Sequence, residues 1–475
     1  MSMNFNGIDK ISVRGYKSIE DETIELRPVT ILAGANSSGK SSIMQPLLLL
    51  KQTLEEKSGT LPLYLPGDNV KLTQYEQIRP KFETATKNEF AFGVENYFLR
   101  ATSVFRYNET TKRIGIYKTI FDYSPYAKSS GDKRFDGVEI DLFEGMSADE
   151  VQEKALKFRL LYGRIDQEKK YELKRESCFL AIRPINQQDE RVGIPGGPDD
   201  TFRPAGVLYR DIRGIIHLPG LRCDPSERKF PRRDIEPLPA DDAPTYLCKG
   251  RFPDYTATLI EAWQEENNSR IAQLIEYVQK LRLATTVSTR QVDDSFLEIL
   301  VGWHPTDKQP KDDDFVNIAD VGCGVSQVLP VLVALVAAKK SQIVYIEQPE
   351  IHLHPKASIA LANVIASAVT DAAKRGVKVV VETHSDLLLL ALQTSVSEHM
   401  NKDGLNPEDV ILYWFEKITD PKDGTVGATK ITKGTLDENG NYDDWPEDFI
   451  ATTLEQQRKF LDAMIARNKR KEGSQ

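Results

Sequence analysis

The sequence predicts an α/β fold with a mixed or largely parallel core sheet. Three short apolar segments support this prediction, at residues 29–32, 343–346 and 377–381, and each runs directly into a polar or glycine-rich stretch. Apolar runs of this length are typical of buried strands in parallel sheets. Because the carboxyl ends of such strands meet at one edge of the sheet, we expect the functional residues to lie at that edge.

Composition limits the class of protein. The chain has 475 residues, a net charge of −9 and 40% hydrophobic residues, which is ordinary for a globular protein. No apolar run is long enough for a membrane-spanning helix, and the N-terminus lacks the basic and apolar regions of a signal peptide. The four cysteines are far apart, which argues against a zinc site or a disulfide framework. We therefore expect a cytoplasmic protein with no membrane partner.

A glycine-rich loop follows the first apolar segment. Residues 34–41 read G-x-x-x-x-G-K-S, and a helix with an apolar side comes next. In this context the glycines let backbone N–H groups turn inward around phosphates. Lys40 would reach the β- and γ-phosphates of ATP, and Ser41 would place its hydroxyl on Mg²⁺, so both cofactors are predicted. The predicted contacts of this loop are Gly34, Asn36, Ser37, Ser38, Gly39, Lys40, Ser41 and Ser42.

The second and third apolar segments end in candidate catalytic residues. Glu347 closes the second segment and is predicted to be the carboxylate on the Mg²⁺ side, so that Ser41 and Glu347 are the predicted metal ligands. His384 follows the third segment and is predicted to sense the γ-phosphate. A single histidine at a strand end is more often structural, but the order of the three motifs favours the sensor role.

A second glycine-rich turn lies at residues 320–327, ahead of an apolar helix. Such loop-to-helix geometry builds an anion site. The glycine-rich loop at residues 34–41, the P-loop, already supplies the phosphate site of its own chain. Gly322, Gly324 and Ser326 would therefore cap the γ-phosphate of a partner chain in a head-to-tail dimer. A plain helix N-terminus with two convenient glycines is the alternative.

Together these motifs resemble the ABC-type ATPase heads of the SMC, RecF and OLD (overcoming lysogenization defect) proteins. Residues 11–19 look like the first strand and turn of that group, and the resemblance places Arg14 and Lys17 near the nucleotide. The implied fold is an ABC-type P-loop ATPase head, with a mixed or parallel core sheet, an antiparallel β-layer and a helical or irregular insertion.

A closer resemblance is to a prokaryotic family of AAA/ABC ATPases. The segments that carry it are 320–330, 347–355 and 382–385, together with a C-terminal D-W-P-x-x-F module at 444–449. Several members of that family look like ATPase subunits of phage-defence systems, such as Septu and retron-associated ATPases.

Two positions depart from the ABC pattern. The resemblance places a general base directly after Glu347, where this chain has Gln348. An amide can orient a water but cannot accept its proton at neutral pH, so hydrolysis should be slow unless Glu350 helps. The turn at 320–327 also lacks the serine of the L-S-G-G signature, which leaves Ser326 as its replacement. The predicted catalytic residues are Glu347, Gln348, Glu350 and His384.

The motif positions divide the chain into five predicted segments. These are the N-terminal part of the ATPase head with the P-loop (1–80), the antiparallel β-layer with a helical insertion (81–204), a connecting strand and helical segment (205–310), the C-terminal part of the head (311–400), and closing strands with the D-W-P module and a tail helix (401–475).

The predicted function is an ATP-binding, slowly hydrolysing ATPase that acts as a sensor or switch subunit. It would form a homodimer or a higher even oligomer closed by ATP, and would control a separately encoded effector, expected to be a nuclease, in phage defence. The alternative is a RecF- or SMC-like ATPase that clamps or repairs DNA directly. The acidic net charge and the lack of sustained heptads favour the first function. Basic runs at 228–233 and 467–471 keep nucleic acid open as a partner.

Overall fold

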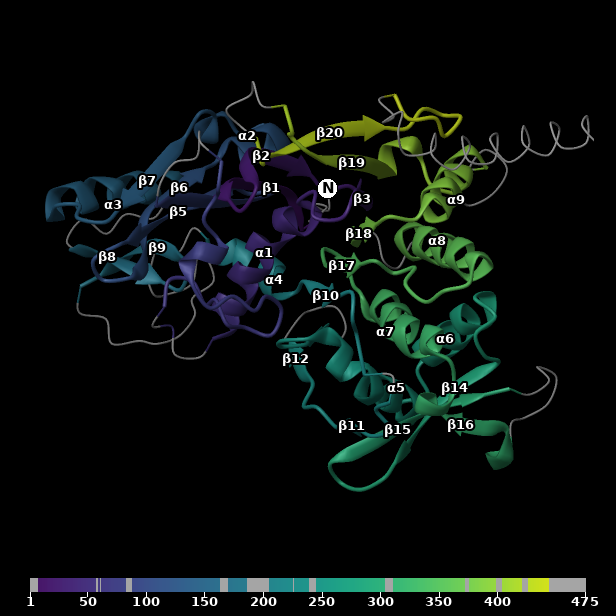
Figure 1. Cartoon of the computed structure of the whole chain (residues 1–475). Coiled ribbons are helices and arrows are strands. Elements are labelled where there is room, and N and C mark those ends of the chain that lie inside the picture. Colours follow the sequence, from purple (N-terminus) through teal and green to yellow (C-terminus); the bar gives the residue numbers. More distant parts are fainter. Residues whose placement is uncertain are drawn as a thin grey trace, which may run out of the picture.

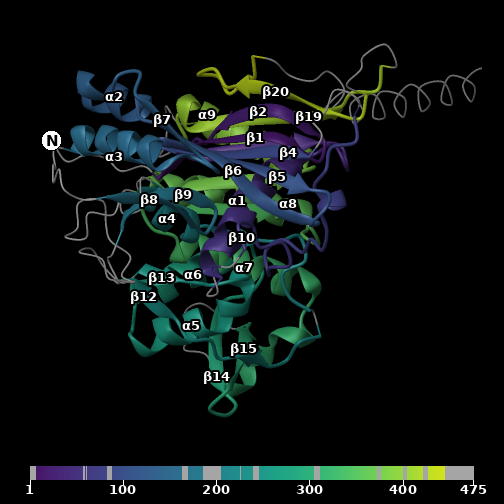
Figure 2. The same ribbon diagram turned by 90° about the vertical axis from the view of Figure 1, so that its left-hand side faces the viewer.

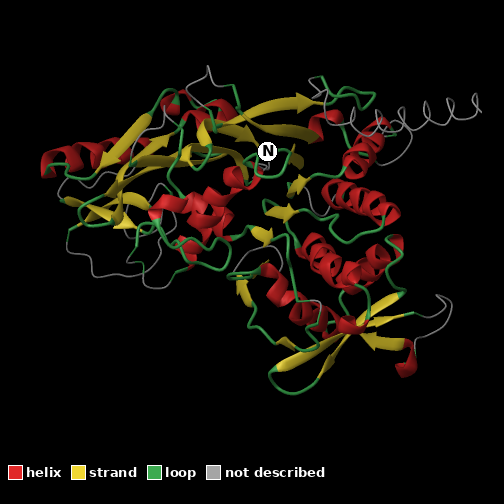
Figure 3. Cartoon of the chain, viewed as in Figure 1, coloured by secondary structure: helices red, strands yellow, loops and turns green. Residues whose placement is uncertain are grey.

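The computed structural model describes most of the chain. The described residues are 7–56, 59, 61–82, 88–162, 170–185, 205–224, 226–238, 245–303, 311–371, 376–398, 404–420 and 426–443. The predicted D-W-P module at 444–449 and the predicted tail helix lie outside this part of the chain. In the described part, strands gather in two large sheets, with helices between and beside them (Figures 1 and 3).

The core sheet is mixed, as the sequence predicted, and contains all three apolar segments. Its order is β10-β17-β18-β3-β19-β20, with parallel pairing from β10 to β19 and an antiparallel edge strand. The P-loop strand β3 therefore lies in the interior of the sheet. The strands are β3 (Val29–Gly34), β10 (Ile216–Leu218), β17 (Ile343–Glu347), β18 (Lys378–Thr383), β19 (Val410–Lys417) and β20 (Thr429–Thr435).

The second large sheet is antiparallel and has the order β2-β1-β4-β5-β6-β7. It contains the hairpins of the predicted β-layer and also the first two strands of the chain, which pair with β4 through β1. Its strands are β1 (Ile8–Tyr16), β2 (Ile19–Glu25), β4 (Glu89–Asn96), β5 (Arg100–Asn108), β6 (Arg113–Asp122) and β7 (Glu139–Phe143).

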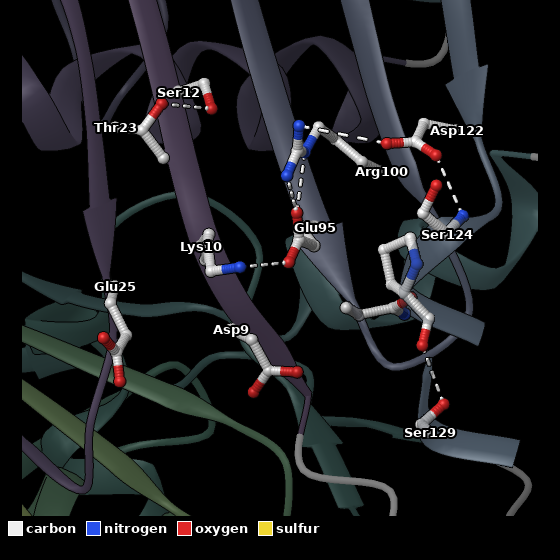
Figure 4. Close-up of polar contacts among 12 residues, drawn as sticks. Asp9, Lys10, Ser12, Thr23, Glu25, Glu95, Arg100, Asp122, Ser124 and Ser129 are labelled. Carbon is white, nitrogen blue, oxygen red and sulfur yellow. Dashed lines mark hydrogen bonds and ion pairs between the residues drawn. The ribbon is translucent and has the colours of Figure 1, made fainter. Parts of the chain in front are cut away.

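Charged side chains cross this antiparallel sheet in a row (Figure 4). Lys10 on β1 donates to Glu95 on β4 at 2.7 Å, and Arg100 on β5 donates to the other Glu95 oxygen at 2.6 Å. The guanidinium of Arg100 also lies 3.9 Å from Asp122 on β6. Cross-strand pairs of opposite charge stabilise a sheet by about 0.2–1 kcal/mol each, so this row helps to hold the register of the four strands.

Residues of the core sheet alternate between two hydrophobic cores. On β3, Val29, Ile31 and Ala33 face one core and Leu32 faces the other. The first core contains the apolar residues of α7 (Cys323–Ala337), α8 (Pro355–Thr370) and α9 (Asp386–Ser397). The second contains those of α1 (Lys40–Glu55) and of the antiparallel sheet. Helix α1 is thus enclosed by two sheets, and each leucine buried there contributes about 1.5–3 kcal/mol.

The remaining elements form smaller units around these layers. A sheet of order β11-β15-β14, with β16 on β15, packs against α5 and α6 at the end of the molecule opposite to β20 (Figures 1 and 2). Two hairpins, β8-β9 and β12-β13, complete the described sheets. No helix of the described part is long and apolar enough to cross a membrane.

The bounds of these elements are α2 (Ser124–Ser130), α3 (Ala148–Tyr162), β8 (Tyr171–Glu176), β9 (Phe179–Pro184), α4 (Gly206–Arg213), β11 (Phe230–Pro231), β12 (Glu236–Leu238), β13 (Thr245–Leu247), α5 (Thr256–Glu265), α6 (Ser269–Lys280), β14 (Thr286–Gln291), β15 (Phe296–Gly302) and β16 (Phe315–Asn317).

Candidate functional site

The P-loop needs its two glycines for both conformation and space. Gly34 has φ 139° and Gly39 has φ 109°, backbone angles that residues with a Cβ rarely adopt. A Cβ on Gly34 would lie 2.3 Å from the carbonyl oxygen of Phe415, and one on Gly39 would lie 2.4 Å from Thr429 Oγ1. Phe415 lies on β19 and Thr429 on β20, so these two strands pack against the loop and leave no room for a side chain at either glycine.

Lys40 and Ser41, the two loop residues predicted to contact phosphate and Mg²⁺, have different hydrogen-bond partners. The ammonium of Lys40 donates to the carbonyl oxygens of Gly34 at 2.9 Å and Ala35 at 2.7 Å, and burial lowers the pKa of this lysine. The hydroxyl of Ser41 donates to Glu382 Oε1 at 2.9 Å. Lys40 therefore closes the loop on itself, while Ser41 joins the start of α1 to the end of β18.

The other predicted loop residues divide by exposure. Asn36 and Ser37 are exposed at the rim of the loop, and Ser37 has a left-handed φ of 62°. Ser38 and Ser42 are buried. Ser38 Oγ has no hydrogen-bond partner, although buried hydroxyls are usually bonded.

A cavity of about 500 Å³ opens beside the loop. Ser37, Gly39, Lys40, Ser41 and Ser42 line it on one side, and Glu382 lines it on another. Four further cations also line it: Lys17, Arg79, Lys81 and Lys417. A cavity with this excess of positive charge favours a polyanionic ligand.

The structure separates the two basic residues that the N-terminal resemblance named. Lys17 lines the cavity and donates to Gln45 on α1 at 2.5 Å. Arg14 lies on β1 and pairs with Glu89 at 3.2 Å in an exposed ion pair. Arg14 does not line the cavity in this structure.

Two carboxylates lie close to one another at the ends of β17 and β18. Glu382 accepts from Ser41 and from the fully buried hydroxyl of Tyr345 at 2.8 Å, and its pKa is raised by burial and by the charge of Glu347. Glu347 lies 3.2 Å from His217 Nε2 and accepts from the backbone of Gly220 at 3.1 Å. Burial pushes the pKa of Glu347 upward, but the contact with His217, the Gly220 N–H and the charge of Arg222 together outweigh it, so the net pKa is lowered.

Glu350 and His384 meet beside the P-loop. Glu350 Oε1 accepts from Thr383 Oγ1 at 2.7 Å and from the backbone N–H of His384 at 3.1 Å. The second oxygen, Oε2, is buried without a hydrogen-bond partner. Burial and the charge of Lys40 lower the pKa of His384, so this imidazole favours its neutral form. Both side chains interact electrostatically with Lys40.

The side chain of Gln348 lies beside Gly220, at the end of β17. Its backbone has a left-handed φ of 45°, and its N–H donates to the carbonyl oxygen of Glu382 at 2.7 Å. The side-chain oxygen lies near Gly220, because a Cβ built on that glycine would be 3.7 Å away. Like Glu347, Glu350 and His384, Gln348 does not line the 500 Å³ cavity in this structure.

A comparison with protein families shows to which family the chain belongs. A family model described as "AAA domain, putative AbiEii toxin, Type IV TA system" matches residues 29–391, from the first residue of β3 into α9. The chain belongs to this family of AAA-type ATPases. The matched range contains the P-loop, both carboxylates at the strand ends and His384. A comparison with curated proteins gave no match.

Solved structures similar to this AAA-type ATPase include three SMC heads. One is an SMC head bound to the C-terminal winged-helix domain of ScpA (13% identity, covering 91% of this chain and 98% of that chain, TM-score 0.39). Another is the SMC head domain from Thermotoga maritima (10%, 90% and 98%, TM-score 0.36). The third is an Smc head with an extended coiled coil bound to the C-terminal domain of ScpA, from Pyrococcus furiosus (12%, 96% and 99%, TM-score 0.39). Because these TM-scores are low, the fold assignment rests on strand order and family membership.

The glycine-rich turn of this AAA-type ATPase does not line the P-loop cavity. Gly322 is exposed and precedes the first residue of α7, and a Cβ on Gly324 would lie 2.8 Å from the carbonyl oxygen of His352. Ser326 is 4% exposed and donates to the Cys323 carbonyl oxygen at 3.1 Å. Its hydroxyl is therefore engaged within its own helix and is poorly placed to contact another chain.

Arg222 joins this turn to the end of β17. Its side chain is 1% exposed, donates to the carbonyl oxygens of Glu347 and Gln348, and lies 3.3 Å from that of Gln327. The amide of Gln327 in turn accepts from the Arg222 backbone at 3.0 Å and donates to Cys223 at 2.7 Å. Burial lowers the pKa of Arg222 to about 10, so it remains charged at neutral pH. It therefore connects α7 to the carboxyl end of β17.

The residues present fit Mg²⁺ together with a nucleotide. Mg²⁺ prefers oxygen ligands and usually binds one or two carboxylates plus substrate phosphates. Ser41 and Glu382 provide a hydroxyl and a carboxylate at hydrogen-bonding distance. Among the described residues, no group of three or more His, Cys, Asp or Glu side chains could hold a metal ion. The nucleotide itself would therefore have to complete the coordination.

Sequence reasoning did not single out several residues of this site: Arg79, Lys81, His217, Glu382 and Lys417. A signal existed for Glu382, since it closes the third apolar segment two residues before His384. His217 and the three cations come from segments whose neighbours depend on the tertiary fold.

Proposed function

We propose that this protein is a Mg²⁺-dependent ATPase whose nucleotide binds in the cationic cavity beside the P-loop. The observation that supports this most directly is the pairing of Ser41 with Glu382 under a cavity lined by lysine and arginine. A triphosphate carries the negative charge that such a cavity requires, and a hydroxyl–carboxylate pair provides hard oxygen ligands for the accompanying cation.

Each side chain around the P-loop would have its own role in binding or hydrolysing ATP. Lys40 would exchange its loop carbonyl contacts for phosphate oxygens, and Ser41 with one strand-end carboxylate, Glu347 or Glu382, would hold the metal. His384, which favours its neutral form, would donate one hydrogen bond from its ring N–H to an oxygen of the γ-phosphate. Gln348 orients the attacking water without accepting its proton, and Glu350 has one unpaired oxygen that can receive it. Because the carboxylate of Glu350 lies two residues after the expected position of the general base, hydrolysis is slow.

The slow cycle suits a switch subunit better than a motor. We expect ATP to hold two copies together head to tail, with the turn at 320–327 of each copy against the nucleotide of the other. The release or activation of a separately encoded effector, expected to be a nuclease in phage defence, would follow that association. The family description names a putative toxin of a toxin–antitoxin system, which is consistent with control through a partner protein.

Two exposed positions allow a direct test of the ATP-closed dimer. Cys323 is exposed in the turn, and Asn36 is exposed on the P-loop. One tagged chain would carry Asn36→Cys with Cys323→Ser, and a second, differently tagged chain would keep Cys323. With a short thiol crosslinker and ATP, we expect a heterodimer that contains both tags. A third chain, with Asn36→Cys and Cys323 together, is the control. The dimer model fails if crosslinks form only within that chain and none joins the two tagged chains.

A parallel measurement separates the two functions. A pull-down against the product of a neighbouring gene and a DNA-binding assay at physiological salt would use the same purified protein. Capture of a nuclease that ATP releases or activates supports the switch. Tight DNA binding that depends on ATP, without such a partner, would favour a DNA-clamping ATPase instead.

A further inference from the structure

Two aromatic rings stand side by side near the strand-end carboxylates. His217 on β10 and Tyr345 on β17 pair in register, and their rings stack at 5.2 Å with 12° between the planes. The Nε2 atom of His217 lies 3.2 Å from Glu347 Oε1. The hydroxyl of Tyr345 donates to Glu382 Oε2 at 2.8 Å. Tyr345 is fully buried and His217 is 3% exposed, so each ring contacts its carboxylate from inside the protein.

The contact with His217 helps to fix the direction of the Glu347 side chain. The other carboxylate oxygen, Oε2, accepts from the Gly220 N–H at 3.1 Å, so each oxygen of Glu347 faces one nitrogen. The lowered pKa of Glu347 keeps this carboxylate ionised, and an ionised carboxylate can only accept hydrogen bonds. The proton of the contact therefore lies on Nε2 of His217.

A turn that follows α1 holds the other side of the imidazole. Asn69 Oδ1 lies 3.2 Å from His217 Nδ1, and Asn69 Nδ2 is buried without a hydrogen-bond partner. The oxygen and nitrogen of an amide are nearly interchangeable in shape, so the hydrogen-bond network decides their assignment. With the amide turned over, Nδ2 donates to Nδ1 of a neutral ring that is protonated on Nε2. Both ring nitrogens then have a matching partner.

Gln52 on α1 fixes the position of this turn. Its side chain is 4% exposed, and its Nε2 donates to three carbonyl oxygens of the turn at residues 64–70. Its Oε1 accepts from the Val70 N–H at 3.0 Å. Helix α1, which begins at Lys40, therefore carries the residue that places Asn69. A continuous series of hydrogen-bonding contacts runs from this helix through the imidazole to the carboxylate.

We propose that His217 is a positioning residue of the metal site, which holds the Glu347 carboxylate in one orientation for the cation bound with the nucleotide. The proposal deepens the proposed function and rests on it for the presence of that cation. His217 acts only through Glu347, and Tyr345 has the corresponding place beside Glu382. Partners of this kind orient metal-binding side chains, and their loss typically weakens metal affinity or activity.

Metal binding can be measured without turnover. Mn²⁺ prefers the same oxygen ligands as Mg²⁺, and its binding with a non-hydrolysable ATP analogue would be followed by electron paramagnetic resonance. We expect His217→Leu to weaken Mn²⁺ binding by about three- to tenfold, at the low end of the effect of such partners. The affinity for ATP in the presence of EDTA should stay at the wild-type level. His217→Gln should recover most of the lost Mn²⁺ affinity, because its amide N–H can replace the Nε2 donor.

Ile216→Ala is the matched control for lost packing. Ile216 precedes His217 on β10 and faces the opposite core, so its truncation weakens the strand without touching either carboxylate. This variant should bind Mn²⁺ as the wild-type protein does. Asn69→Ala provides a second measurement that does not depend on the folding of His217→Leu. It leaves the imidazole in place but removes its support, and we expect a smaller loss of Mn²⁺ affinity.

A double-mutant cycle tests whether His217 acts through Glu347. In a Glu347→Ala background the carboxylate is absent, so His217→Leu should cause no further loss of Mn²⁺ affinity. An equal further loss in that background would overturn the proposal. Wild-type affinity in both His217→Leu and Asn69→Ala, or the same loss in Ile216→Ala, would also overturn it. If the wild-type protein binds neither ATP nor Mn²⁺, the proposed function fails and this proposal fails with it.

Discussion

The hydroxyl of Ser41 donates a hydrogen bond of 2.9 Å to Glu382, and strand order explains why this carboxylate is the one it meets. β18 lies between β3 and β17, so Glu382 pairs in register with Leu32 on one side and Glu347 on the other. Adjacent strands are about 4.8 Å apart, and Glu347 is therefore one strand farther from the P-loop strand than Glu382 is.

This relationship predicts an unequal effect of two matched substitutions. Glu382→Gln keeps the size of the side chain and an acceptor for Tyr345, but removes the charge beside Ser41. We expect it to raise the Mg²⁺ concentration needed for half-maximal ATP binding by at least about tenfold, as loss of a direct metal ligand would. Glu347→Gln should have a smaller effect. A magnesium titration of nucleotide binding on both variants decides the order, and the reverse order would favour Glu347 as the ligand.

The P-loop lysine gives a second prediction. Lys40→Ala should abolish measurable ATP binding, because it removes the ammonium that would leave the loop carbonyls and contact the phosphate oxygens. Lys40 is 4% exposed, and its removal also takes one charged donor from the carbonyl oxygens of Gly34 and Ala35. We therefore expect a loss of stability of about 1–3 kcal/mol alongside the loss of binding. Isothermal titration with ATP and a urea melt measure the two effects. Wild-type affinity in this variant would disprove the site.

Much of the site could be predicted because its motifs are local. Gly34, Gly39 and Lys40 lie in one short segment, and their spacing alone fixes a strand, a loop and a helix start. The same holds for Glu347, which closes an apolar run, and for His384, which follows one. The mixed core sheet and antiparallel layer are also as predicted.

The residues that sequence reasoning missed or misplaced depend on pairing across the chain. His217 reaches Glu347 only because β10 pairs with β17, more than a hundred residues later. Arg14 is near the P-loop in sequence, but it lies on a different sheet and pairs with Glu89 there. Neither placement follows from the local pattern, because strand order is set by the packing of whole layers.

Arg222 supports a third prediction, about positioning rather than binding. Arg222→Lys keeps the charge but cannot reach three carbonyl oxygens with a single ammonium. We expect ATP affinity to change by less than about threefold, while turnover falls by about tenfold or more because Gln348 and the start of α7 lose their common support. Gln327→Ala should have the same direction of effect. Steady-state phosphate release and nucleotide titration separate the two quantities, and equal losses in both would indicate general unfolding.

The last prediction concerns the residue that takes the proton from water. Gln348 can orient a water but lacks a basic oxygen, and proton transfer to a positioned base is worth roughly 100- to 10,000-fold. Glu350 holds Thr383 and His384 through one oxygen and has the other unpaired. Native turnover should therefore be slow, and Glu350→Gln should reduce it by about 100-fold.

Gln348→Glu is the matched test of the same idea. It changes one amide to a carboxylate at the position next to Glu347, with no change in side-chain length. We expect it to raise ATP turnover and to shorten the ATP-bound dimer state, which would weaken the switch even as hydrolysis accelerates. Phosphate release and crosslinking lifetime, measured on the same samples, report both effects. If native turnover is fast, Gln348→Glu is neutral and Glu350→Gln is inactive, then Glu350 is the full base and the slow-switch mechanism is wrong.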